Sequence, residues 1–77
     1  MPTLAEMKTG QKAIIERLDG NDAIVQRIYE MGVLEGEEIE ILGFAPLGDP
    51  IEILVKGYRL SLRQQEAARI HVTPTPS

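Results

Sequence analysis

IEILVKGYRLSLR, residues 51–63, decides the fold of this 77-residue chain. Apolar side chains recur at every second position on either side of its centre: Ile51, Ile53, Val55, Leu60 and Leu62. A period of two is typical of β-strands that bury one face. Lys56-Gly57 separates the two runs, and connections of two residues form the tightest hairpins. The stretch therefore predicts a β-hairpin.

Further strand patterns flank this hairpin, at residues 11–18, 37–44 and 70–72. Residues 22–31 differ, because Ile24, Ile28 and Met31 recur at helical spacing and predict one amphipathic helix. Asn21 or Asp22 is suited to cap its first turn, and Gly32 is suited to end it. Residues 64–68 predict a single helical turn before the last strand. Thr73–Ser77, with two prolines, is predicted to stay outside the sheet.

Together these patterns predict a mainly β fold. We expect a small SH3-like β-barrel of about five strands, with one helix inserted after the first strand and a short helical turn before the last. Closure of the barrel is favoured because it removes exposed sheet edges. Residues 1–73 should form the one domain, and residues 74–77 a flexible tail.

Composition excludes several classes of function. The formal net charge is −4, and acidic residues concentrate between Glu35 and Glu40, so a nucleic-acid partner is not expected. No apolar run approaches the roughly 20 residues needed to span a bilayer, so direct membrane insertion is not expected either. The amino terminus lacks the basic start and apolar stretch of a signal peptide, and we expect a cytoplasmic protein.

The sequence offers no recognisable catalytic or metal-binding set. His71 is the one histidine, and strand alternation turns it away from the core, where a solvated residue is the simplest interpretation. Ser61 has no base near it, and the glutamates of residues 35–40 alternate outward on a strand. We therefore predict no enzyme activity, no catalytic residue, no metal site and no cofactor.

A loop rich in proline and glycine, APLGDP at residues 45–50, is the most unusual stretch. Pro46 and Pro50 fix the backbone, Gly48 permits positive φ, and Asp49 can bond nearby amides. Leu47 is therefore expected near the tip of a stiff connector. Two interpretations are open: Leu47 folds back on the core, or it is a preorganised apolar anchor for a partner.

Four segments resemble the FeoA family of small cytoplasmic proteins of bacterial ferrous iron transport. They are RIYEMGV with Gly36, APLGDPI, GYRLSLR and AARI, in this order over about residues 4–72. The resemblance implies an SH3-like barrel with a helical insertion. It also implies a partner, a membrane ferrous iron transporter with a cytoplasmic GTP-binding domain, for which the protein would be an accessory or regulatory subunit. The same module resembles the C-terminal domain of iron-dependent repressors.

Our first hypothesis is thus a regulator that binds the transporter. Its candidate partner-binding residues lie in the loop and on the helix: Pro46, Leu47, Gly48, Asp49, Arg27, Tyr29 and Met31. The alternative is a stand-alone metal-binding or metal-sensing module, which needs His71 and the outward glutamates to converge. An SH3-type adaptor for proline-rich peptides is disfavoured by the three aromatic residues in total. The sequence leaves open a homo-oligomer.

Overall fold

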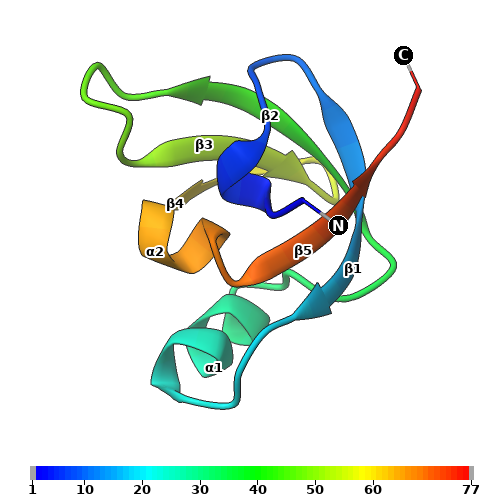
Figure 1. Ribbon diagram of the computed structural model, residues 1–77, viewed down its shortest axis with the longest axis vertical. Coiled ribbons are helices and arrows are strands. Elements are labelled where there is room, and N and C mark those ends of the chain that lie inside the picture. Colours follow the sequence, from blue (N-terminus) through cyan, green and yellow to red (C-terminus); the bar gives the residue numbers. More distant parts are fainter. Residues whose placement is uncertain (1, 77) are drawn as a thin grey trace.

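One antiparallel sheet of five strands forms the protein, in the order β4-β3-β2-β1-β5 (Figure 1). The computed structural model describes residues 2–76. The elements in chain order are η1 (Leu4–Glu6), β1 (Lys12–Leu18), α1 (Ala23–Glu30), β2 (Glu38–Phe44), β3 (Ile51–Val55), β4 (Tyr58–Leu62), α2 (Gln64–Ala67) and β5 (Ile70–Pro74). The predicted mainly β architecture, the inserted helix and the helical turn before the last strand are confirmed.

The sheet is strongly curved but not closed, so the predicted closure is wrong. β4 and β5 are its two ends and do not pair with each other. The short helices η1 and α2 lie at this opening between β4 and β5, since η1 contacts both α2 and β5. Figure 1 shows η1 and α2 on the same side of the sheet. The sheet of five short strands is therefore barrel-like although β4 and β5 do not pair to close it.

Strand alternation places the core as predicted. Buried apolar side chains come from every element and from the connections after η1 and α1: Leu4, Met7, Ala13, Ile15, Leu18, Val25, Ile28, Val33, Ile39, Ile41, Ile51, Ile53, Val55, Leu62, Ala67, Ile70 and Val72. The 51–63 hairpin is confirmed, with Val55 paired to Tyr58 across Lys56-Gly57. Leu60 is only half-buried, because β4 lies at the end of the sheet and has a neighbour on one side alone.

α1 begins and ends as predicted, but its buried face is different. Asp22 is the N-cap, and its Oδ1 accepts a hydrogen bond from the Val25 amide at 3.4 Å. The buried residues are Val25 and Ile28, whereas Ile24 and Met31 are half-buried. The buried stripe begins at Val25, one position after the predicted start at Ile24, because the predicted pattern for residues 22–31 did not include Val25.

Gly32 ends α1 with φ +90°, the left-handed conformation expected of it. A second constraint acts on the same residue. The hydroxyl of Tyr58 would lie 2.7 Å from a Cβ at this position. Glycine is thus favoured chiefly by the backbone angle, and a larger residue would also displace the end of the Tyr58 side chain.

The carboxyl-terminal residues join the sheet further than expected. Thr73 pairs with Ile14 and Pro74 with Ala13, and the amide of Thr75 donates to the carbonyl of Lys12 at 2.9 Å. The prediction that Thr73 and Pro74 stay outside the ladder is therefore wrong. Because β5 lies at the end of the sheet, a proline there need not break a ladder on both sides. Of the predicted tail, Ser77 lies outside the described residues.

Arg69, the residue before β5, holds the beginning of α1 in place. Both oxygens of the Asp22 carboxylate accept hydrogen bonds from the Arg69 guanidinium, at 3.0 and 2.9 Å. The same guanidinium donates to the carbonyl of Asp19 at 3.2 Å. The hydrogen bond from Arg69 lowers the pKa of Asp22 below its ordinary value, and the amide of Val25 adds to this effect.

This pair predicts a pH dependence of stability. Since the pKa of Asp22 is lowered in the folded state, the pair stabilises the fold above the unfolded pKa. The contribution is lost as the pH falls through the folded pKa. Below about pH 4, the melting temperature of the wild type should fall more steeply than that of Arg69→Gln. Circular dichroism melts between pH 7 and pH 2 measure this, and parallel curves for both proteins would contradict it.

Candidate protein-binding site

The loop between β2 and β3 presents one apolar side chain to solvent. The amide of Ala45 donates to the carbonyl of Pro50 at 3.0 Å, and the amide of Gly48 donates to the carbonyl of Ala45 at 2.7 Å. Gly48 adopts φ +86°, which lets the chain turn back so tightly. Leu47 at the tip is 96% exposed. Of the two open interpretations, the one in which Leu47 folds back on the core is therefore wrong.

The first residue of α2 binds the loop at residues 45–50. The side-chain amide of Gln64 donates to the carbonyl of Gly48, and the backbone amide of Gln64 donates to Asp49 Oδ1 at 3.1 Å. The Arg63 guanidinium lies 3.9 Å from the other oxygen of Asp49. Figure 1 shows the loop and α2 on one side of the molecule. The role of Asp49 in the structure is thus to anchor the loop.

Gln64 is the residue of this site that sequence reasoning missed. Its place in a predicted helical turn gave no sign of the contact, because the loop lies 15 or 16 positions earlier in the chain. Its neighbour Gln65 is exposed and makes none of these contacts.

The candidate residues of α1 form a separate group. Arg27 is exposed, but its guanidinium lies 3.4 Å from Glu66 Oε2. The Glu66 side chain is 4% exposed, and its Oε1 accepts the amide of Arg63 at 2.8 Å. Arg27 therefore neutralises a buried carboxylate of α2. α2 thus lies between the two candidate groups and contacts both.

Tyr29 and Met31 are less accessible than Arg27. Both are half-buried against the core. The Tyr29 hydroxyl donates to Glu35 Oε2, and this hydrogen bond raises the pKa of Tyr29 above its ordinary value. A partner at this face would therefore contact mainly Arg27, and only the exposed parts of Tyr29 and Met31.

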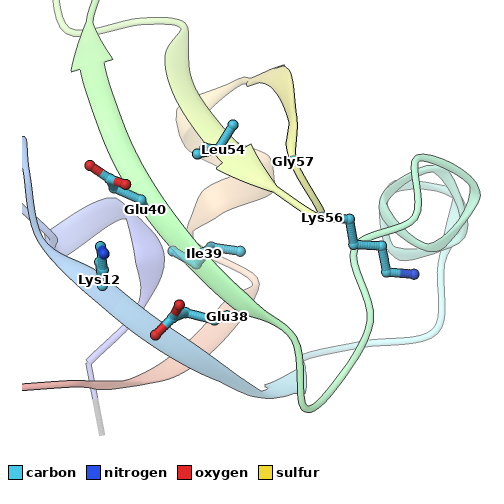
Figure 2. A pocket seen from close by; sticks show the side chains of 7 residues that line it. All are labelled: Lys12, Glu38, Ile39, Glu40, Leu54, Lys56 and Gly57. Atoms are coloured by element: carbon cyan, nitrogen blue, oxygen red, sulfur yellow. The ribbon is translucent and has the colours of Figure 1, made fainter.

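The outward glutamates of β2 line a depression of about 190 Å³ on the outer face of the sheet. Lys12 pairs with Glu40 across the β1–β2 ladder. Figure 2 shows Lys12 beside Glu38 and Glu40, whereas Lys56 extends away from them. The Lys56 ammonium lies 3.5 Å from Glu37 instead. The carboxylates of Glu38 and Glu40 thus lie on the outer face of the sheet, as predicted, with Lys12 beside them.

His71 is more enclosed than the sequence predicts. Its side chain is only 17% exposed, and its Nε2 lies 3.6 Å from Asp19 Oδ2. The amino-terminal segment covers it, because Thr3 forms a bridge with His71. Within residues 2–76, no group of three or more histidine, aspartate or glutamate side chains is arranged to hold a metal ion. No helix in this part of the chain has the length and apolar character to cross a membrane.

Comparison with known proteins gives one family. The family model described as "FeoA domain" matches residues 3–74. A Fe(2+) transport protein A/Fe(2+) transporter FeoB fusion protein from Porphyromonas gingivalis (strain ATCC BAA-308 / W83) is 41% identical over 69 residues. The match covers 90% of this chain but only 8% of the fusion protein.

Solved structures share the architecture. A FeoA-like protein from Clostridium acetobutylicum is 36% identical with a TM-score of 0.92, over 97% of this chain and 87% of that chain. Stenotrophomonas maltophilia FeoA, described as a procaryotic SH3 domain protein and solved with zinc, is 34% identical with a TM-score of 0.82, over 95% and 91%. A manganese-dependent transcriptional repressor, 16% identical with a TM-score of 0.89 over 96% of this chain and 36% of its own, shares the fold alone.

The contacts of Gln64 predict that it sets the rigidity of the loop. In Gln64→Ala, residues 46–48 lose the side-chain hydrogen bond to the Gly48 carbonyl, and their backbone order parameters should fall from about 0.85 toward 0.6. ¹⁵N relaxation measures this. Gln65→Ala is the matched control and should leave the loop unchanged. A loop that stays rigid in Gln64→Ala would show that the brace is dispensable.

Proposed function

The chain belongs to the FeoA family, and we propose that it serves ferrous iron transport by binding a membrane ferrous iron transporter with a cytoplasmic GTP-binding domain. In this proposal it is an accessory protein without catalytic activity. Its contact with the transporter is the braced loop at residues 45–50. Arg27 on α1 is a second, adjacent contact, which α2 holds in a fixed position relative to the loop.

The exposure of Leu47 is the observation that carries the proposal. A fully solvated leucine on a braced loop contributes nothing to the core. Burying such a side chain in a partner is worth about 1.5–3 kcal/mol. Because the loop is already fixed by Gln64, little conformational entropy is lost on binding. An apolar residue held this way is suited to enter a pocket of another protein.

The fusion protein supports the choice of partner. In the Porphyromonas gingivalis relative, Fe(2+) transport protein A and Fe(2+) transporter FeoB are parts of one chain. Tethering two modules raises their effective concentration, often to the millimolar range for a short linker. Two modules that are joined in one protein are natural candidates for partners where they are separate chains.

Metal binding is the second candidate, and the zinc complex of Stenotrophomonas maltophilia FeoA favours it. In this chain the residues it would use are divided. His71 lies on β5 beside Asp19, whereas Glu38 and Glu40 face solvent on β2 beside Lys12. Anaerobic calorimetry with Fe²⁺ separates the candidates: binding at micromolar metal would favour the metal-binding module over the transporter accessory.

We expect Leu47→Asp to weaken both transporter binding and transporter-dependent iron uptake. Loss of one buried leucine corresponds to about a 10- to 100-fold weaker affinity. The readouts are capture of the transporter from detergent-solubilised membranes and uptake of radioactive ferrous iron by cells. The melting temperature should stay close to that of the wild type, because Leu47 makes no core contact.

Two control variants make this test specific. Leu47→Met keeps an apolar side chain of similar volume and should retain binding. Gln65→Asp adds the same charge at an exposed position of α2 without removing an apolar group. If Gln65→Asp weakens binding as much as Leu47→Asp does, charge and not the apolar anchor is responsible, and the proposed contact is wrong.

A further inference from the structure

The two ends of the sheet differ in how they are protected. β5 is covered by the chain itself: Thr3 forms a bridge with His71, and the amide of Val72 donates to the carbonyl of Pro2 at 2.9 Å. β5 also ends in Pro74. Figure 1 shows the amino-terminal segment beside β5. Bridging and proline are the usual means by which proteins block pairing at an edge strand.

β4 has none of these protections. Its pairing with β3 runs without a register shift, whereas the β1–β5 and β2–β3 pairs each contain one. It contains no proline, and Tyr58, Arg59 and Ser61 are all exposed. Within residues 2–76, β4 is therefore an edge strand without a register shift or a proline, and no strand pairs with its outer side.

The hairpin geometry shows which backbone groups this edge presents. Lys56 has φ 53° and Gly57 has φ 84°, as in a two-residue type I′ turn. Such a turn makes Val55 and Tyr58 a hydrogen-bonded pair, and the antiparallel pattern alternates from there. The amides and carbonyls of Arg59 and Ser61 therefore point away from β3. Arg63, two residues after Ser61, follows the same alternation, because its amide donates to Glu66 Oε1 and not to β3.

We propose that the β4 edge binds an extended segment of another protein, which adds to the sheet as a sixth strand. The backbone groups of Arg59 and Ser61 supply the hydrogen bonds, as in other cases of β-strand addition. This surface is distinct from the Leu47 loop, and the proposal does not rest on the identity of the transporter. It concerns the chemistry of the segment that would pair here.

Side chains along the edge specify that segment. Tyr58 is 45% exposed and Leu60 is half-buried on the core-facing side, so they favour apolar partners. On the other face, Arg59 is exposed. The Lys56 ammonium lies 3.5 Å from Glu37 and the Arg63 guanidinium 3.9 Å from Asp49, whereas Arg59 has no ion pair among the described residues and is the cation this edge offers to a partner. The occupant is therefore a strand that alternates apolar and acidic residues.

The same charges argue against a second copy of this chain as the occupant. Pairing of two β4 edges would bring two copies of Arg59, which has no ion pair among the described residues, to one junction. Like charges across a strand pair are destabilising. Charge on an edge strand is a common means of preventing self-pairing. The edge is thus open to a different, acidic chain and closed to itself.

Titration of the ¹⁵N-labelled full chain with a synthetic peptide tests the proposal. The probe is acetyl-Glu-Val-Glu-Val-Glu-Val-Glu-amide, and the same peptide with lysine in place of glutamate is its control. We expect the acidic peptide to bind at sub-millimolar to millimolar concentration and to shift the Arg59 and Ser61 amides most. The lysine peptide should bind at least about fivefold more weakly.

Two substitutions at one position provide the decisive comparison. Ser61→Pro removes an outward amide without removing a β3–β4 hydrogen bond, so the fold should survive and peptide affinity should fall at least about tenfold. Ser61→Ala keeps that amide and should bind like the wild type. No binding of the acidic peptide, equal affinity for Ser61→Pro and the wild type, or dimerisation through β4 in sedimentation would each overturn the proposal.

Discussion

The polar side chains between β4 and β5 hold together parts of the chain that the sheet does not join. Within residues 2–76, the side-chain hydrogen bonds that connect segments more than six positions apart all come from Gln64 and Arg69. Gln64 secures the β2–β3 loop, and Arg69 secures the start of α1. Between them, Glu66 contacts Arg27 from a buried position. The sheet is open between β4 and β5. The contacts of Gln64, Glu66 and Arg69 therefore connect the parts of the chain that strand pairing connects in a closed barrel.

Local features of the structure could be predicted from the sequence, whereas features that depend on distant contacts could not. Period-two alternation predicted the 51–63 hairpin and its core face, and turn chemistry predicted a cap at Asn21 or Asp22 and a stiff loop with Leu47 near its tip, but it left open whether Leu47 is exposed. The open sheet, the pairing of Pro74 and the cover over His71 arise where the two ends of the chain meet the strands. The same holds for the candidate site: the spacing of proline and glycine marked the loop, but no local pattern revealed Gln64 as its brace.

A chain of this size has little interior in which to build a reactive site, so its recognition chemistry lies on the surface. Two surface features are suited to binding proteins. One is a single apolar side chain on a braced loop, and the other is the unpaired edge of β4, which carries Arg59. β4 is followed directly by α2, and Gln64 of α2 donates a hydrogen bond to the loop, so α2 links the β4 edge to the loop. A partner that engaged both would contact one continuous side of the protein.

Photo-crosslinking from the loop tests most directly whether Leu47 contacts the transporter. A photoreactive phenylalanine analogue replaces Leu47 in one protein and the exposed Glu16 of β1 in another. Cells are irradiated, and crosslinked partners are identified by mass spectrometry of the membranes. We predict that the transporter is crosslinked from position 47 and not from position 16. Absence of the transporter from the position 47 products, or equal yields from both positions, would contradict a contact at this loop.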